Sequence, residues 1–390
     1  MGMRKEMKKY FILSGLDLND NNRGTAALGY GAFSFLQEKG FLHEGQELLI
    51  IKYVRNPLKI GSVVEDISIQ GKVWKKRTVY LFSLHKRLLR KYNIVLPFLS
   101  LARLCKKIDF VATINGGDGL SDIYDTDMFL GRLPETFFAM RMKIPVIQLP
   151  QTIGPFSIAQ NYELASKILR YSKAVFVRDR KFVDELDKMG IKYEVTKDLS
   201  AYMQPEPWNI EIHPNSVGIN VSGLCYSNTF RTLSGQFGEY RNLINNIIEH
   251  FQSKGVYVYL IPHSYCYEKE EASNDDMVAC EAAYNRLVNK EKVIFVNENL
   301  TSPKVKYVIS QMSFFIGTRM HANFAAIYTG VPVFGLAYSY KFEGAFNANG
   351  LDAENQTAKI NDISLSDISK IINKIDSFYQ ENQRKMISYA

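Results

Sequence analysis

Short apolar runs alternate with amphipathic helical stretches along most of this 390-residue chain. In the first half we expect strands at 10–14, 47–53, 110–114, 145–149, 174–177 and 192–195. In the second half the expected strands are 217–221, 256–261, 293–296, 314–316 and 331–334. Because helical patterns lie between these runs, the chain is predicted to form βαβ units and parallel, doubly wound α/β sheets.

A proline-rich segment divides this alternation in two. Pro205, Pro207 and Pro214 lie within ten residues, which is typical of a linker. We therefore expect two Rossmann-like domains, residues 1–205 and 206–390, with the active site in the cleft between them. The final helix, 364–381, is expected to pack back on the N-terminal domain.

The charge of the chain is concentrated in one segment. Residues 51–107 contain 14 Lys or Arg against two acidic residues, while the whole chain carries a net charge of +8. This segment predicts either a peripheral membrane surface for anionic lipid or lipid-linked phosphate, or a solvated basic helix face. Nucleic acid is not expected as a partner, because no known binding motif accompanies the charge.

The remaining composition favours a cytoplasmic protein. No run of about 18 apolar residues is present, so no membrane span is predicted, and the apolar run after the basic N-terminus is too short for a signal peptide. Association with the inner face of a membrane is the alternative that the basic segment leaves open. The four cysteines are scattered, which indicates isolated thiols rather than disulfides or a zinc site.

The strand expected at 314–316 is followed by Gly317, Thr318, Arg319, Met320 and His321. This order predicts a strand, a tight turn and a helix that Thr318 caps. Arg319 and His321 would then flank the helix N-terminus, where unpaired N–H groups favour an anion. The alternative is that Arg319 forms a salt bridge and His321 packs in the core.

Polar residues also follow strands in the first half, and each has a structural alternative. Asn22 and Arg23 lie in a loop that forms an anion cradle or a plain capped turn. Asp118 lies in a glycine-rich loop, as a base, a hydroxyl ligand or a cap. Gln151 hydrogen-bonds a ligand or satisfies the backbone of its turn. Arg178 directly follows a strand and suits a carboxylate or phosphate.

Two further residues are candidates in the second half. His263 follows a strand with carboxylates within reach, so it is a candidate acid, base or phosphate ligand, although a lone His is more often structural. Lys341 could close the same pocket together with Tyr338. The set forms a cationic pocket for a small polyanion, and no cluster has metal-ligand spacing, so we predict no metal and no cofactor.

Taken together, these segments resemble the polysaccharide pyruvyl transferase family from Asn22 to Leu351. The specific signal is Gly317-Thr318-Arg319-Met320-His321-Ala322, with Gly330-Val331-Pro332 and Tyr338-Ser339-Tyr340-Lys341. Supporting segments are Gly116-Gly117-Asp118-Gly119, Gln151-Thr152-Ile153-Gly154-Pro155, Val177-Arg178-Asp179, Asp198-Leu199-Ser200 and Pro262-His263. The resemblance implies a GT-B-like fold. It also implies transfer of pyruvate from phosphoenolpyruvate to a sugar as a cyclic ketal, in cell-surface or exopolysaccharide biosynthesis.

The resemblance also implies roles for particular residues. The family's phosphoenolpyruvate ligands correspond to Arg319 and His321, with Arg178 as a further one, and we add Met320 and Lys341. His321 or His263 would be the acid and Asp118 a base. The sugar or lipid-linked oligosaccharide acceptor would contact Asn22, Arg23, Asp118 and Gln151.

Two other functions remain open at this point. A GT-B-type glycosyltransferase would place the diphosphate of a nucleotide sugar at the same helix terminus. A glycan- or lipid-binding scaffold at a membrane would use the basic segment and need no catalytic residues.

Overall fold

The computed structural model describes residues 9–92, 104–115, 117–265, 273–339 and 341–388. Gly116, Cys266, Tyr340 and residues 93–103 of the basic segment lie outside the described residues. The chain divides into two compact units. The N-terminal unit runs to Asp17 and continues over Leu28–Tyr202, and the C-terminal unit comprises Leu18–Ala27 and the chain from Met203 on.

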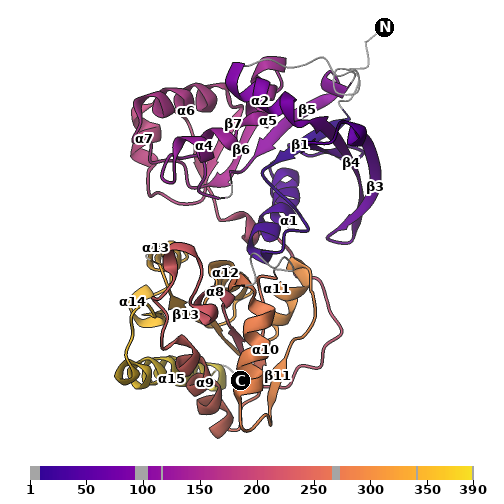
Figure 1. The fold of residues 1–390 in the computed structure, drawn as a ribbon. Coiled ribbons are helices and arrows are strands. Elements are labelled where there is room, and N and C mark those ends of the chain that lie inside the picture. The colour runs from indigo at the N-terminus through magenta and orange to yellow at the C-terminus, as the bar shows by residue number, and fades with distance from the viewer. Residues whose placement is uncertain (1–8, 93–103, 116, 266–272, 340, 389–390) are drawn as a thin grey trace. The chain divides into compact units, whose positions relative to one another are not determined.

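The N-terminal unit is built on an eight-stranded sheet in the order β3-β4-β2-β1-β5-β6-β7-β8 (Figure 1). Its strands are β1 (Tyr10–Ser14), β2 (Glu47–Val54), β3 (Gly61–Ile69), β4 (Lys72–Phe82), β5 (Ile108–Thr113), β6 (Val146–Gln151), β7 (Ala174–Val177) and β8 (Glu194–Val195). Its helices are α1 (Arg23–Glu38), η1 (Pro57–Lys59), α2 (Ser83–Tyr92), α4 (Thr126–Gly131), α5 (Pro134–Met142), α6 (Ala159–Tyr171), α7 (Val183–Lys188) and η2 (Leu199–Ala201). The first turn of α1, up to Ala27, belongs to the C-terminal unit. Helices α2 and α5 cover one face of the sheet, and aromatic residues of α1 pack on the other.

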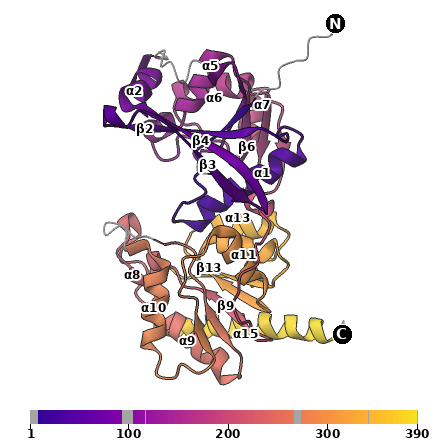
Figure 2. The same ribbon diagram turned by 90° about the vertical axis from the view of Figure 1, so that its right-hand side faces the viewer.

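The basic segment contains a feature that the sequence analysis missed. Strands β3 and β4 pair antiparallel, and Gln70 and Gly71 between them both have positive φ, at 54° and 74°. Such a pair is typical of a two-residue hairpin turn. Figure 2 shows the two strands as a long ribbon. Much of the predicted basic helix face is therefore strand. The sequence did not show this, because charged residues occupy the exposed positions of the ribbon and hide its alternation of apolar and polar side chains.

The C-terminal unit is built on a six-stranded parallel sheet in the order β11-β10-β9-β12-β13-β14. Its strands are β9 (Val217–Asn220), β10 (Val258–Leu260), β11 (Val293–Phe295), β12 (Phe314–Gly317), β13 (Val333–Ala337) and β14 (Thr357–Lys359). Its helices are α8 (Gly223–Ser227), η3 (Arg231–Leu233), α9 (Tyr240–Ser253), α10 (Asp276–Arg286), α11 (Ser302–Ser310), α12 (Met320–Ile327), α13 (Lys341–Ala348), α14 (Ala353–Gln356) and α15 (Leu365–Ser388). Strand β14 was not expected from the sequence.

Both faces of this second sheet are covered by helices. Helices α9, α10 and α15 form one buried cluster with it, and α11, α12 and α13 form another. The last helix, α15, was expected on the N-terminal domain. Instead, its residues Ile368, Ile371, Ile375 and Tyr379 are buried in the core of its own unit, where α15 contacts α9.

Each sheet reverses its strand order once, between β1 and β5 in the first unit and between β9 and β12 in the second. In open parallel sheets, ligands bind at the carboxyl ends of the strands beside such a reversal. The ends of β9, β10 and β12 are therefore the first place to look for a site in the C-terminal unit.

Candidate active site

One buried carboxylate joins the ends of three strands in the C-terminal unit. Asp276, the first residue of α10, accepts from the backbone N–H groups of Gly223 (2.8 Å) and His263 (3.2 Å) and from Asn220 Nδ2 (3.1 Å). These residues follow or end strands β9 and β10. These hydrogen bonds tie the start of α10 to the ends of both strands.

Asp276 also holds the side chain of Arg319, at the end of β12. Its Oδ1 lies 2.7 Å from Nη2 and 3.1 Å from Nε, and Asn274 Oδ1 accepts from Nη2 at 2.7 Å. Burial acts to lower the pKa of Arg319, but the charge and hydrogen bonds of Asp276 outweigh it and raise that pKa. The salt bridge foreseen as the alternative role of Arg319 is thus present. Nη1 has no hydrogen-bond partner among the described residues.

Thr318 is not the helix cap that the sequence predicted. Helix α12 begins at Met320 with Arg319 as its N-cap residue, and the Arg319 N–H donates to Asn220 Oδ1 at 2.9 Å. The Thr318 hydroxyl instead shares a buried 2.7 Å hydrogen bond with the hydroxyl of Tyr240. The helix thus starts one residue later than predicted, and His321 takes its second position.

His321 lies against the beginning of α1. A Cβ atom placed on Gly24 would approach His321 Nδ1 to 2.6 Å and its Cβ to 2.8 Å, so only glycine fits there. On its other side the imidazole meets Phe324 edge to face, with 5.5 Å between ring centroids. The partly exposed imidazole is therefore held in one place by its neighbours.

His263 is affected by two arginines and by a second histidine. Its pKa is lowered well below 6.5, first by burial and then by His321, Arg319 and Arg23. Its Nδ1 is buried and has no hydrogen-bond partner among the described residues. His263 is consequently a neutral imidazole at pH 7, which makes it a poor acid.

The side chain of Arg23 makes several contacts within the C-terminal unit. Its guanidinium donates to the carbonyl oxygens of Leu300 (2.6 Å) and Asp20 (2.5 Å) and to Asn299 Oδ1, and it lies 4.5 Å from the ring of Tyr265. Asn22, just before it, accepts from the Gly24 N–H at 3.0 Å. These contacts fix the loop that carries Gly24. They correspond to the capped turn, the structural alternative to an anion cradle.

Arg178 and Asp118 lie in the N-terminal unit. Arg178 Nη1 is 2.9 Å from Asp198 Oδ2, and its Nε donates to Thr152 Oγ1 at 3.2 Å. A Cβ on Gly117 would lie 3.1 Å from Nη1, so the glycine loop passes close to the guanidinium. Asp118 accepts from the Tyr124 hydroxyl at 2.9 Å. Burial acts to lower the pKa of Arg178, but Asp198 above all, with Asp179 and Asp118, raises that pKa.

Gln151 has a backbone role. It is fully buried, its Oε1 accepts from the Asn115 N–H at 3.0 Å, and its Nε2 donates to the Thr113 carbonyl at 3.3 Å. This is the structural alternative that the sequence analysis gave for it, and both ends of the amide are already used.

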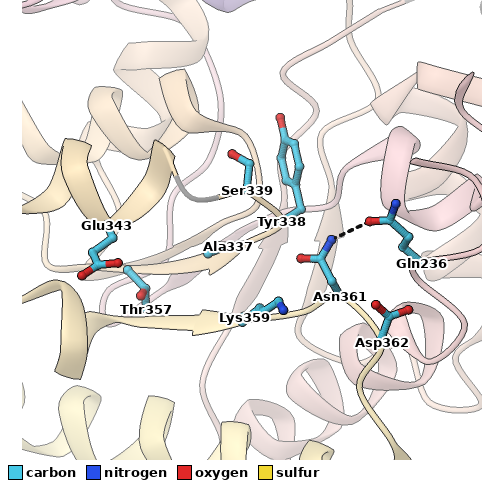
Figure 3. Close-up of a pocket in the computed structure, with 9 residues that line it drawn as sticks. All are labelled: Gln236, Ala337, Tyr338, Ser339, Glu343, Thr357, Lys359, Asn361 and Asp362. Carbon is cyan, nitrogen blue, oxygen red and sulfur yellow. Dashed lines mark hydrogen bonds between the residues drawn. The ribbon is translucent and has the colours of Figure 1, made fainter. Parts of the chain in front are cut away.

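A pocket of 460 Å³ opens where β13 and β14 end (Figure 3). Lys341 starts helix α13, three residues after Tyr338, one of the residues that line it. The full lining is Gln236, Ala337, Tyr338, Ser339, Glu343, Thr357, Lys359, Asn361 and Asp362. Burial raises the pKa of the Tyr338 hydroxyl, and the charge of Arg319 acts to lower it.

The described residues contain neither a metal cluster nor a membrane-spanning helix. In that part of the chain no group of His, Cys, Asp or Glu side chains is arranged to hold a metal ion. Nor does any helix there combine the length and apolarity needed to cross a bilayer.

Known structures resemble this fold at low sequence identity. A UDP-N-acetylglucosamine 2-epimerase from Methanocaldococcus jannaschii matches with a TM-score of 0.51 and 11% identity, over 98% of this chain and 100% of that one. A second UDP-N-acetylglucosamine 2-epimerase matches with a TM-score of 0.50 and 12% identity, over 97% and 90%. Together with the two doubly wound sheets, these likenesses show a GT-B-type fold. The predicted interdomain location of the active site stays a prediction.

The sequence itself identifies the family. A model of the family described as polysaccharide pyruvyl transferase matches residues 22–340, from the loop before Gly24 through the whole Arg319 site. With most of its length matched, the chain belongs to the polysaccharide pyruvyl transferase family.

Proposed function

We propose that this protein transfers pyruvate from phosphoenolpyruvate to a pair of sugar hydroxyls, giving a cyclic ketal during polysaccharide biosynthesis. The observation that carries the proposal is the group formed by Arg319, His321 and the first turn of α12, beside a strand reversal, in a member of this family. Phosphoenolpyruvate bears a phosphate and a carboxylate, so it needs several fixed donors.

The phosphate would bind at Arg319 and the start of α12. Asp276 holds two nitrogens of the guanidinium, and Nη1 remains for the ligand. The N–H groups of the first helical turn add donors and a positive dipole. A preorganised guanidinium loses little entropy on binding, so its ion pair with Asp276 supports the role.

Ketal formation consumes two hydroxyl groups and releases inorganic phosphate. The methylene carbon of phosphoenolpyruvate gains a proton, one sugar oxygen bonds to C2, the C2–O bond to phosphate breaks, and the second sugar oxygen takes its place. The two sugar hydroxyls release two protons. One equals the proton taken up by the methylene carbon as it becomes a methyl group, and the other leaves with phosphate. We assign the acid to His321, because the pKa of His263 lies too low for a proton at pH 7.

Neutral His263 then serves as an acceptor or as a polar wall beside the donor. Arg178, as a carboxylate ligand, and Asp118, as a base, stay proposals for the N-terminal unit. The same holds for Met320 and Lys341 as further contacts to the donor. Asn22, Arg23 and Gln151 were proposed as acceptor contacts. The hydrogen bonds of Arg23 and Gln151 are those of structural residues.

A membrane surface is our proposal for the basic segment. Leu58 and Val73 are 92% and 73% exposed, and Lys59 and Lys72 adjoin them in the sequence. Apolar side chains among lysines suit an anionic bilayer. The protein should sediment with phosphatidylglycerol vesicles at low salt, and Leu58→Ser/Val73→Ser should weaken this. Equal sedimentation with phosphatidylcholine vesicles would contradict the proposal.

The deciding experiment incubates the protein with phosphoenolpyruvate and a panel of methyl glycosides and looks for the mass of a pyruvate ketal. His321→Ala should abolish transfer, while His43→Ala, at an exposed histidine, should not. Phosphoenolpyruvate should also raise the melting temperature by mass action. Stabilisation by a nucleotide sugar but not by phosphoenolpyruvate would favour the glycosyltransferase alternative.

A further inference from the structure

The pocket at the ends of β13 and β14 has polar groups that the fold does not use. Among the described residues, Glu343, Lys359 and Asp362 have no side-chain hydrogen bond or ion pair to another residue. Asn361 donates to Gln236 Oε1 at 3.0 Å, which fixes both amides in the wall, as Figure 3 shows. Such groups suit a ligand that both donates and accepts hydrogen bonds.

The charge of the lining disfavours an anion as the natural occupant. Two carboxylates, Glu343 and Asp362, face one cation, Lys359, so the lining has a net charge of −1. A phosphate or diphosphate would meet uncompensated repulsion, whereas a neutral hydroxylated ring would not. Tyr338 adds an aromatic wall with an apolar face and a hydroxyl.

The position and the volume of the pocket also favour a neutral sugar ring as its ligand. At 460 Å³ the pocket is within the range for small-molecule sites and exceeds what three-carbon phosphoenolpyruvate needs. Tyr338 belongs to this lining and directly follows β13, and Arg319 follows β12, which pairs in parallel with β13. A ligand in the pocket would therefore adjoin the proposed donor site, inside one unit.

We infer that this pocket binds one neutral sugar ring of the acceptor, beside phosphoenolpyruvate at Arg319. The inference rests on the proposed function. It moves the acceptor site from Arg23 and Gln151, whose polar groups are used by the backbone, to side chains that are available.

The test is the double variant Glu343→Gln/Asp362→Asn in the full-length chain, which keeps side-chain shape and leaves at position 362 a residue that tolerates its positive φ of 54°. The matched control is Glu354→Gln, at an exposed residue of α14 outside the lining. Saturation-transfer NMR would use methyl glucoside, galactoside and mannoside, with UDP in parallel. Melting temperatures would be measured with phosphoenolpyruvate.

We expect at least one glycoside to bind the wild type and the control, with affinity about tenfold weaker in the double variant. The shift caused by phosphoenolpyruvate should be the same in all three proteins. Binding of no glycoside, equal glycoside binding in the double variant, or UDP binding lost in that variant would overturn the inference. A missing phosphoenolpyruvate shift in the wild type, with glycoside binding intact, would instead overturn the proposed donor.

Discussion

The carboxylate of Asp276 and the guanidinium of Arg319 form a buried ion pair with 2.7 Å between Oδ1 and Nη2. The two residues lie 43 positions apart and belong to α10 and the end of β12. Because the same carboxylate accepts from β9 and β10 as well, the pair sets the position of Arg319 relative to three strands.

Replacing Asp276 by Asn should destabilise the protein and weaken donor binding together. The amide cannot balance the buried charge of Arg319, and breaking such a pair costs about 3–5 kcal/mol. Urea unfolding would measure the loss, and the melting shift with phosphoenolpyruvate should shrink. The double variant Asp276→Asn/Arg319→Met should recover part of the stability but none of the shift. Wild-type stability in the single variant would contradict the structural role.

Gly24→Ala should lower transfer by about a hundredfold and also lower the stability, because the added Cβ would meet the Cβ of His321 at 2.8 Å. The new methyl group would displace the His321 ring, and a misplacement of about 1 Å costs that much in rate. Gly238→Ala, where nothing lies within 4 Å of the added Cβ, is the matched control. Comparable turnover in both variants would show that His321 needs no fixed position.

Acid should destabilise the protein partly through His263. Its pKa is lowered in the folded state, so below about pH 6.5 the unfolded chain binds a proton that the folded chain resists. Stability should therefore fall as the pH drops from 6.5, by at most about 1.4 kcal/mol per unit for this group. Urea midpoints of wild type and His263→Gln between pH 7.5 and 5.5 would show it. Parallel curves would mean that His263 titrates normally.

Arg23→Lys separates a structural role from a role in binding the acceptor. Lysine cannot replace three directed hydrogen bonds and the contact with Tyr265, so unfolding should become easier by about 2 kcal/mol. Arg180→Lys, at an exposed position, should change nothing. If Arg23 instead contacts the sugar, the variant would raise the acceptor KM and leave the urea midpoint unchanged.

The fold could be predicted wherever residues were buried on both sides. The strands around Phe110, Val217 and Phe315 are nearly continuous apolar runs, and the sequence located all three. The hairpin β3–β4 was missed because Lys75, Lys76 and other charged residues interrupt its apolar positions.

The candidate site was predictable in part. Arg319 and His321 follow a strand directly, so local order was sufficient to select them. The function of Asp276 was not visible, because its partners come from three other segments and only tertiary structure brings them together. Arg23 and Gln151 show the opposite limitation, because both were selected as ligand contacts from the sequence. A polar residue after a strand can hydrogen-bond the backbone as readily as it binds a ligand.

The bond from the Arg319 N–H to Asn220 joins residues 99 positions apart, across neighbouring parallel strands. Neighbouring parallel strands are joined by a crossover connection, which must be synthesised before the two strands can pair. Pairing between residues so far apart in the sequence is slow. During synthesis on the ribosome, the corner proposed to bind the donor can assemble only once β12 has emerged. A chain that ended before that strand would contain β9, β10 and Asp276 but would lack Arg319, the proposed phosphate ligand.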